Sequence, residues 1–206
     1  MLKMENIDGF LREMERYARE HEVPILTEAA RPVFSQTVRR TAPLRILELG
    51  TAIGYSALLA LRESPGASLV TIERDAALAE TAKAFLQRAG ENYAARVTLL
   101  VGEAENLLPT LSGEFDFVFI DAAKSRYPDF WLGVQSLLAP RAVVVADNVL
   151  FRGLVEGEGS EAWPKHSYRT MVLRLREYLR IVRTAPGFRT EVFPEGDGMA
   201  VSWRDE

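Results

Sequence analysis

Between residues 45 and 146 the sequence alternates short apolar runs with longer stretches of helical periodicity. The apolar runs predict strands at residues 45–49, 68–73, 97–101, 115–120 and 142–146. The stretches between them predict helices at residues 54–63, 75–89, 103–111 and 127–138. Strands that alternate with helices form a parallel sheet that is covered on both faces. We therefore expect a doubly wound α/β domain, in which ligands bind outside the carboxyl ends of the strands.

The segments that flank this region complete the predicted domain. An N-terminal amphipathic helix is indicated by apolar residues that share one face: Ile7, Phe10, Leu11, Met14 and Ala18. A second helix is expected over about residues 27–40, where Pro32 either kinks the helix or occupies its first turn. A long basic helix follows the alternating region at roughly 164–183. Two last strands, "FRTEVFP" and "GMAVSWR", are joined by "EGDG" and predict an antiparallel hairpin at one edge of the sheet.

Composition limits the class of protein. The length of 206 residues suits one domain with a substantial core, so residues 1–206 are expected to form a single unit. The absence of cysteine excludes disulfides, thiolate-bound zinc and cysteine nucleophiles, and it suits a reducing cytoplasm. We expect a cytoplasmic protein without membrane attachment, because the first ten residues lack the apolar core of a signal peptide and no apolar run is long enough to span a bilayer.

Charge gives a weaker indication of the partner. The formal net charge of −4 offers no general reason to expect nucleic acid. Basic residues nevertheless cluster late in the chain: Lys165, Arg169, Arg174, Arg176, Arg180, Arg183 and Arg189. This helix either contacts phosphates of an RNA or is a solvated face over core leucines.

The first strand ends in a glycine turn, in the segment "ILELGTAIGYSALLA". Gly50 and Gly54 allow the backbone to turn tightly and to approach a ligand closely. The helix that begins near Tyr55 and Ser56 offers free N–H groups to an anionic group. The spacing differs from the G-x-G-x-x-G of dinucleotide-binding folds, so the segment indicates either a nucleotide-type ligand or a structural strand–helix turn.

The next two strands also end in polar residues. In "VTIERD", Glu73 is placed to accept hydrogen bonds from a ribose diol, as acids in this position do in related folds. The alternative is a solvated acid that precedes a helix whose N-cap is Asp75. In "LLVGEAENL", Gly102 and Glu103 end the third strand beside the same crevice, where contacts with adenine are expected.

Two neighbouring strands then end in acids. Asp121 follows "FDFVFI", and Asp147 and Asn148 follow "AVVVA", so three oxygen ligands are expected to converge. Such hard ligands suit Mg²⁺, Mn²⁺ or Ca²⁺. Lys124 lies one step away, and a nearby dication favours the neutral amine that a general base requires. The alternative is an N-cap aspartate with a surface lysine.

These four motifs, in this order, resemble the cation-dependent S-adenosylmethionine O-methyltransferases, which include catechol O-methyltransferase. The resemblance runs from about residue 24 to 203 and implies a Rossmann-like class I methyltransferase fold, with a mostly parallel seven-stranded sheet. It implies Lys124 as the catalytic base and Asp121, Asp147 and Asn148 as ligands of Mg²⁺ or Mn²⁺. The residues that it implies for S-adenosylmethionine are Glu48, Gly50, Thr51, Tyr55, Ser56, Glu73, Arg74, Gly102, Glu103, Ala104 and Asp121. Ala122 and Ala123 depart from the pattern, since catechol methyltransferases carry a His-Trp pair there.

A narrower set of segments is similar to the bacterial tRNA 5-hydroxyuridine methyltransferases. These segments are "MERYAREHEVPIL", "ELGTAIGYSAL", "TIERD", "FIDAAKSRY", "DNVLFRGLV" and "GDGMAVS". The likeness implies a tRNA anticodon loop as the partner, with methylation of 5-hydroxyuridine at the wobble position. It also implies a homodimer that uses the N-terminal helices of residues 1–42. Tyr127 and Arg152 are then expected to touch the acceptor.

Two other functions stay open from the sequence. The first is methylation of a small catechol or phenol, because a catechol and 5-hydroxyuridine both present two adjacent oxygens that one cation can chelate. The second is an NAD-dependent oxidoreductase, which leaves the cluster of Asp121, Lys124, Asp147 and Asn148 without a role.

Overall fold

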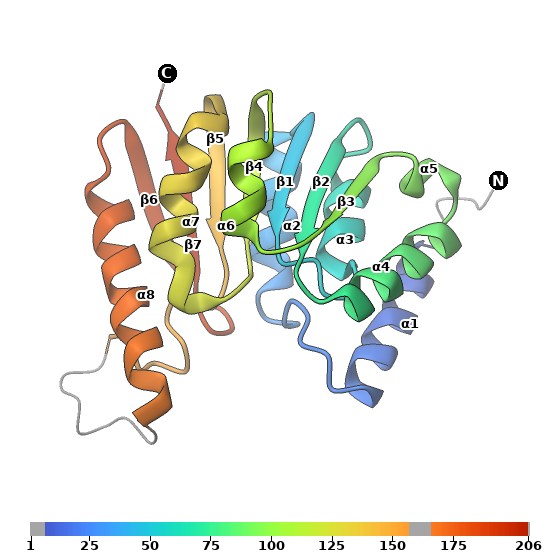
Figure 1. The fold of residues 1–206 in the computed structure, drawn as a ribbon, viewed down its shortest axis with the longest axis horizontal. Coiled ribbons are helices and arrows are strands. Elements are labelled where there is room, and N and C mark those ends of the chain that lie inside the picture. The colour runs from blue at the N-terminus through green and yellow to red at the C-terminus, as the bar shows by residue number, and fades with distance from the viewer. Residues whose placement is uncertain (1–6, 157–165, 206) are drawn as a thin grey trace.

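A computed structural model describes residues 7–156 and 166–205 of the chain. Its centre is a seven-stranded sheet in the order β3-β2-β1-β4-β5-β7-β6, with helices on both faces (Figure 1). The strands are β1 (Arg45–Leu49), β2 (Ser68–Glu73), β3 (Val97–Val101), β4 (Phe115–Ile120), β5 (Leu138–Ala146), β6 (Phe188–Phe193) and β7 (Met199–Arg204). The first five are parallel, while β7 pairs antiparallel with both β5 and β6. The predicted class I fold and its C-terminal hairpin are confirmed.

The helices follow the predicted order with some differences in length. They are α1 (Ile7–Glu20), α2 (Arg31–Thr41), α3 (Tyr55–Glu63), α4 (Ala76–Ala89), α5 (Glu91–Ala94), α6 (Ala104–Leu107), α7 (Tyr127–Val134) and α8 (His166–Thr184). Pro32 lies in the first turn of α2, where its missing N–H costs nothing, so it does not kink the helix. The helix predicted at 103–111 is a short α6 followed by a 3₁₀ turn at Leu108–Thr110. The start predicted for α8 at residue 164 lies outside the described residues.

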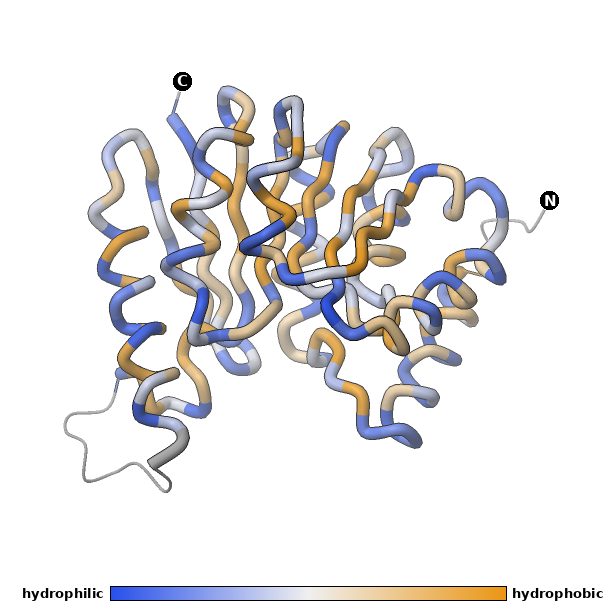
Figure 2. The backbone as a smooth tube through the Cα atoms, in the orientation of Figure 1, coloured by the Kyte–Doolittle hydropathy of each residue, from blue (hydrophilic) through white to orange (hydrophobic). Residues whose placement is uncertain are grey.

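The burial pattern of the strands explains why the sheet is covered on both faces. In β4, Phe117 and Phe119 belong to the core under α1 to α4, while Val118 and Ile120 belong to the core under α6 to α8. The ring centroid of Phe119 lies 4.6 Å from that of Phe34 on α2, which fixes α2 against the sheet. Figure 2 shows hydrophobic residues through the strands and hydrophilic residues along the helix surfaces and turns. Both faces of these strands therefore contribute to the hydrophobic core.

The order of the strands determines where a ligand can bind. The chain adds β2 and β3 on one side of β1, then crosses to add β4 and β5 on the other side. Crossovers that leave in opposite directions open a crevice at the carboxyl ends of β1 and β4, where the order reverses. No helix within residues 7–156 and 166–205 is long and apolar enough to cross a membrane.

Candidate active site

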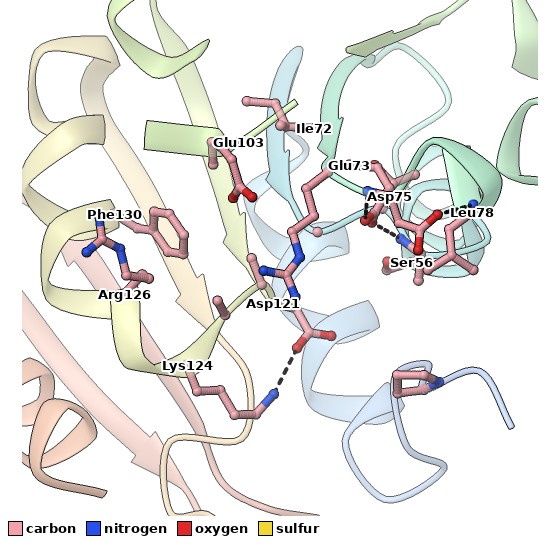
Figure 3. Close-up of a pocket in the computed structure, with 18 of the residues that line it drawn as sticks. Ser56, Ile72, Glu73, Asp75, Leu78, Glu103, Asp121, Lys124, Arg126 and Phe130 are labelled. Atoms are coloured by element: carbon pink, nitrogen blue, oxygen red, sulfur yellow. Dashed lines mark hydrogen bonds and ion pairs between the residues drawn. The ribbon is translucent and has the colours of Figure 1, made fainter. Parts of the chain in front are cut away.

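A cavity of about 570 Å³ lies at the carboxyl ends of the parallel strands (Figure 3). Residues that follow β1, β2, β3 and β4 form its floor and sides, and the segment Pro24, Ile25 and Leu26 forms another wall. All the residues predicted to bind the cofactor line this cavity except Glu48. The four strand-end motifs therefore converge on a single cavity.

The glycine turn allows β1 and β4 to end against each other. A Cβ on Gly50 would lie 2.2 Å from the backbone oxygen of Asp121, and the φ of Gly50 is +99°, so only glycine fits without a shift. Gly54, with φ of +81°, precedes the first residue of α3, and no side chain caps that helix. The N–H groups at the start of α3 are therefore free to meet a negatively charged group.

Glu73 is held by the backbone on both of its carboxylate oxygens. Its Oε2 accepts the N–H of Ala52 at 2.8 Å, and its Oε1 accepts the N–H of Asp75 at 2.9 Å. Each oxygen keeps a second lone pair, and the side chain lines the cavity. This arrangement fixes a carboxylate that can still accept two hydroxyls of a ribose. Asp75 caps α4 through hydrogen bonds from Ala77 and Leu78, as the alternative expected, but Glu73 is buried and is not the solvated acid of that alternative.

Glu48 lies behind the cavity wall and forms no part of its lining. Its two carboxylate oxygens accept hydrogen bonds from the hydroxyls of Ser56 and Thr71, each at 2.6 Å. The oxygens of Thr71 and Thr51 are 2.5 Å apart and extend this hydroxyl chain. Burial raises the pKa of Glu48 to about 7, although both hydroxyls oppose the shift. Glu48 can thus influence a ligand through Ser56 and through its charge, while Ser56 and Thr51 reach the cavity directly.

The carboxylates at the ends of β4 and β5 form an electrostatically coupled pair. Burial, and then the negative charge of Asp121, raise the pKa of Asp147 to about 7. Burial also raises the pKa of Asp121. Asn148 lines the cavity and adopts a left-handed φ of +56°, which asparagine tolerates better than most residues. Its backbone N–H donates to Oδ1 of Asp147 at 2.8 Å.

This donor set fits a divalent cation. The carboxylates of Asp147, which is buried, and of Asp121, which is partly exposed to the cavity, are hard oxygen ligands like the carboxamide of Asn148, and a dication would compensate the charge of the neighbouring carboxylates. No group of three or more His, Cys, Asp or Glu residues suited to a metal occurs within residues 7–156 and 166–205. Asp121, Asp147 and Asn148 would therefore supply only some of the ligands of Mg²⁺, and waters would supply the others, as is usual for this ion.

Lys124 begins a 3₁₀ turn, Lys124–Arg126, directly beside the acids. Its Nζ lies 3.7 Å from Oδ1 of Asp121, and Figure 3 shows the two side chains facing each other. The turn is held from outside by Arg174 of α8, whose Nε donates to the backbone oxygen of Ser125 at 3.0 Å. Arg126 pairs with Glu105 at 2.5 Å across the rim of the cavity. The turn that carries Lys124 is thus held in place at the part of the cavity that Asp121 lines.

Tyr127 and Arg152, which were predicted to touch an acceptor, are not among the residues that line this cavity. Tyr127 is fully buried, and its hydroxyl donates to the backbone oxygen of Asp147 at 2.9 Å, so it supports that strand end from below. Arg152 is exposed, with its guanidinium 5.7 Å from the ring centroid of Phe151. Neither residue lines the cavity.

Part of the basic cluster on α8 is used inside the molecule. Arg174 pairs with Asp129 and Glu177, and Arg176 donates to the backbone oxygens of Leu154 and Val155. Arg169, Arg180 and Arg183 are exposed. Some arginines of α8 therefore stabilise neighbouring loops, and others are exposed, where they could be solvated or contact RNA.

Some lining residues were missed by sequence reasoning. Phe130 resembles any core residue of an amphipathic helix, yet it also lines the cavity beside Arg126. Pro24, Ile25 and Leu26 form an apolar run between α1 and α2, and Leu26 is also part of the hydrophobic core. An apolar run between two helices predicts burial, so it indicates core packing as readily as contact with a ligand.

Comparisons with known proteins agree with this geometry. A family model described as O-methyltransferase matches residues 9–205. A catechol O-methyltransferase of Mycobacterium tuberculosis is 40% identical over 129 residues, which cover 62% of this chain and 58% of that protein. The structure of TomG, an O-methyltransferase of Streptomyces achromogenes in complex with S-adenosylmethionine, superposes with a TM-score of 0.81 and 29% identity over 96% of this chain and 90% of that one. The methyltransferase PaMTH1 of Podospora anserina, bound to S-adenosylhomocysteine, gives a TM-score of 0.82 and 29% identity over 95% and 88% of the two chains.

Proposed function

The chain belongs to the O-methyltransferase family, and we propose that it transfers the methyl group of S-adenosylmethionine to a hydroxyl oxygen with the help of a divalent cation. The single observation that carries the proposal is the position of Lys124, Asp121 and Asn148 on one side of the cavity that Glu73 and the glycine turn also line. An adenosine-type cofactor and an acidified hydroxyl are the two reactants that such a cavity suits. An NAD-dependent oxidoreductase would leave the lysine and the acids without a role.

The residues around the cavity would have different roles in the proposed reaction. When bound, S-adenosylmethionine would supply an electrophilic methyl group, and a cation held by Asp121, Asp147 and Asn148 would supply positive charge that acidifies a hydroxyl. Glu73 would accept the ribose hydroxyls. Lys124 would take up the proton that the acceptor hydroxyl releases, which makes the acceptor oxygen a nucleophile. The ammonium so formed lies within ion-pair reach of Asp121, at 3.7 Å.

We propose 5-hydroxyuridine at the wobble position of tRNA as the acceptor, in a cytoplasmic enzyme. The support is the set of segments shared with bacterial tRNA 5-hydroxyuridine methyltransferases, together with the exposed arginines Arg169, Arg180 and Arg183 on α8. Phosphates of an anticodon loop would be bound by such side chains, and the splayed base would enter the cavity. The same likeness supports a homodimer built through residues 1–42, which sedimentation equilibrium would test.

A small catechol is the second candidate acceptor. It is supported by the 40% identity with the catechol O-methyltransferase of M. tuberculosis. A catechol also presents a hydroxyl beside a second oxygen, so the same residues would serve it. Arg174 and Arg176 of the basic helix α8 already form hydrogen bonds within the protein. Fewer arginines are then left to bind RNA phosphates, which favours the small acceptor.

Nucleoside mass spectrometry of tRNA distinguishes the two acceptors. Cells that lack the protein should accumulate 5-hydroxyuridine and lose its methyl ether. Purified protein should methylate such tRNA at a rate that falls steeply between low and physiological salt, because several phosphate contacts release counterions. Unchanged tRNA nucleosides together with salt-independent methylation of a catechol would instead identify the small-molecule function.

A further inference from the structure

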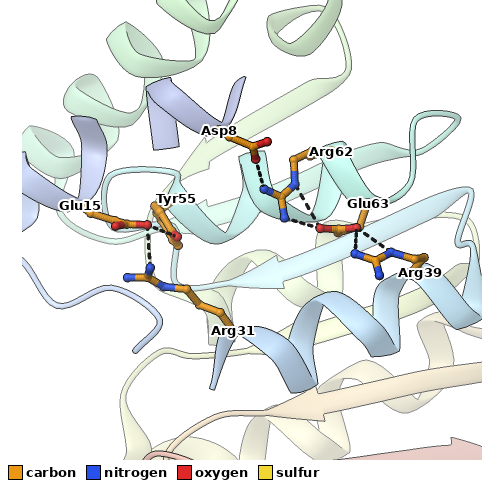
Figure 4. A network of polar contacts seen from close by, with 7 residues as sticks. All are labelled: Asp8, Glu15, Arg31, Arg39, Tyr55, Arg62 and Glu63. Atoms are coloured by element: carbon orange, nitrogen blue, oxygen red, sulfur yellow. Dashed lines mark hydrogen bonds and ion pairs between the residues drawn. The ribbon is translucent and has the colours of Figure 1, made fainter. Parts of the chain in front are cut away.

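Two polar networks connect the N-terminal helices to α3, one at each end of that helix (Figure 4). At the end of α3, Arg62 pairs with Asp8 of α1, and Glu63 pairs with Arg39 of α2 at 2.7 Å. At the start of α3, which faces the cavity, Tyr55 is linked to Glu15 of α1. The two networks join the same three helices, but only the second borders the cavity.

Arg31 is the hub of the network at the cavity. Its Nη1 lies 2.6 Å from Oε1 of Glu15, and that same oxygen accepts the hydroxyl of Tyr55 at 2.8 Å. Its Nε donates to the backbone oxygen of Leu26 at 3.2 Å, and its Cζ lies 5.1 Å from the centroid of the Tyr55 ring. One guanidinium therefore contacts both Leu26 and Tyr55, and each of these residues lines the cavity.

The contacts of Arg31 fix two walls of the cavity that come from distant parts of the chain. Leu26 belongs to the connection between α1 and α2; its side chain is buried in the core, and its backbone oxygen accepts the hydrogen bond from Arg31. Tyr55 is the first residue of α3, and its hydroxyl points away from the cavity toward Glu15. Arg31 and Glu15 are 24% and 17% exposed, so the pair is partly shielded from water and is not a free surface ion pair.

We infer that Arg31, held by Glu15, is a positioning residue for S-adenosylmethionine: it keeps Leu26 and Tyr55 in the arrangement that the bound cofactor requires. The inference rests on the proposed function, because it assigns this cavity to the cofactor. Arg31 itself does not line the cavity and would act only through Leu26 and Tyr55. Without it, the backbone at Leu26 loses a hydrogen bond and the ring of Tyr55 loses a neighbour, so both have to be brought into position when the cofactor binds, and that ordering reduces affinity.

The test is calorimetric titration of S-adenosylhomocysteine into wild-type protein and matched variants, with thermal unfolding of each. Arg31→Gln should weaken binding by about tenfold, the lower end of the effect of a hydrogen bond to a charged group. Glu15→Gln and Tyr55→Phe should each weaken it by about threefold, as loss of one bond of the network does. Arg31→Lys keeps the charge for Glu15 but lacks the Nε donor to Leu26, so it should fall between wild type and Arg31→Gln.

Asp8→Asn is the matched control, since it also removes an acid of α1 that pairs with an arginine, but at the end of α3 that is remote from the cavity. It should leave the affinity within about twofold of wild type, even where it lowers the unfolding temperature as much as Glu15→Gln does. In steady-state assays, Arg31→Gln should raise KM for S-adenosylmethionine and leave kcat and KM for the acceptor unchanged. A general loss of stability does not produce that split.

The outcomes separate this inference from the proposed function. Wild-type protein that fails to bind S-adenosylhomocysteine would remove the proposed function and this inference together. Wild-type protein that binds, with Arg31→Gln binding equally well, would overturn the inference alone. Equal losses of affinity in Asp8→Asn and Glu15→Gln would also overturn it, because the effect would then come from the helix layer as a whole.

Discussion

The ammonium nitrogen of Lys124 lies 3.7 Å from Oδ1 of Asp121, at the point where β4 ends and the cavity begins. The pKa of Asp121 is raised because burial outweighs the opposing effect of this lysine. One lysine thus offsets only part of the charge that Asp121 and Asp147 bring to adjacent strand ends. The remaining negative charge explains why a cation is expected at this place.

Replacement of Lys124 by Met should lower kcat for methyl transfer by about two to four powers of ten, the usual effect of losing a general base. Methionine keeps most of the length of the side chain and removes the amine. The rate is measured with excess S-adenosylmethionine and Mg²⁺, on tRNA that contains 5-hydroxyuridine or on a catechol. Lys83→Met on α4 is the control, because Lys83 is 57% exposed and does not line the cavity. Equal rates for wild type and Lys124→Met would show that another group takes the proton.

Removal of divalent cations should abolish turnover, and Mg²⁺ or Mn²⁺ should restore it. The physical reason is that burial, and then the negative charge of Asp121, raise the pKa of Asp147 to about 7, so a cation would stabilise the two ionised carboxylates. Mg²⁺ should also raise the unfolding temperature of wild-type protein at pH 8, and this rise should be smaller in Asp147→Asn. Full activity in EDTA, or an identical thermal shift in both proteins, would contradict the metal site.

Glu48→Gln should change how stability depends on pH. The pKa of Glu48 is about 7 in the folded protein against an ordinary value of 4.5, so the stability that this group contributes is fully present below pH 4.5 and is lost as the pH rises through 7. Glutamine does not ionise, so the variant should gain about 2 to 3 kcal/mol relative to wild type between pH 5 and pH 8. Urea unfolding at the two pH values measures this difference. A constant difference between the two proteins would show that Glu48 titrates normally.

Gly50→Ala should destabilise the protein far more than Gly187→Ala. Both glycines have positive φ, at +99° and +72°, so each substitution carries a conformational cost of about 1 to 2 kcal/mol. An added Cβ at Gly50 also meets the backbone of Asp121 at 2.2 Å, whereas no atom lies within 4 Å of a Cβ at Gly187. The clash should add about 1 to 3 kcal/mol, as overpacking of a rigid site does. Chemical denaturation gives both values, and equal losses would mean that the two strand ends separate easily.

Arg174→Met should lower kcat while KM for S-adenosylmethionine stays close to wild type. Arg174 holds the turn of Lys124 through the backbone oxygen of Ser125, and it is itself fixed by Asp129 at 2.7 Å. A less constrained turn places the amine less accurately, which should cost about tenfold in rate. Thr170→Ala is the control, because Thr170 is exposed on the same helix. A similar fall in kcat for both variants would indicate a general effect of α8.

Much of the fold could be predicted because its local patterns agree with its tertiary structure. The bounds of β1, β2, β3 and β4 are those that the apolar runs indicated. β5 begins at Leu138, earlier than the expected residue 142, and it includes Pro140 and Arg141. In this first part of β5 only Leu138 pairs with β4, opposite Phe115, and the register between the two strands then shifts so that Phe117 pairs with Val143. A proline is tolerated there because the regular ladder has not yet begun.

The strand-end residues of the candidate site could also be foreseen, since parallel strands bring their carboxyl ends to one edge. Contacts that depend on helix packing could not. Glu15 and Tyr55 are 40 residues apart, and nothing in the sequence near either one indicates the other. For the same reason Tyr127 was expected at an acceptor, although its ring packs under the sheet edge, 5.5 Å from that of Tyr178.

The reversal of strand order between β1 and β4 has a practical consequence for engineering. Residues at or after the ends of β1, β2 and β3 line the cavity that we assign to the cofactor, whereas β5 and the C-terminal hairpin lie on the other side of β4 in the sheet. Diversified libraries that aim at a new acceptor should therefore vary the segments after Asn148 and leave the chain before Val101 untouched. The two parts of the sheet meet at Gly50 and Asp121, so that junction is the place where such redesign has least freedom.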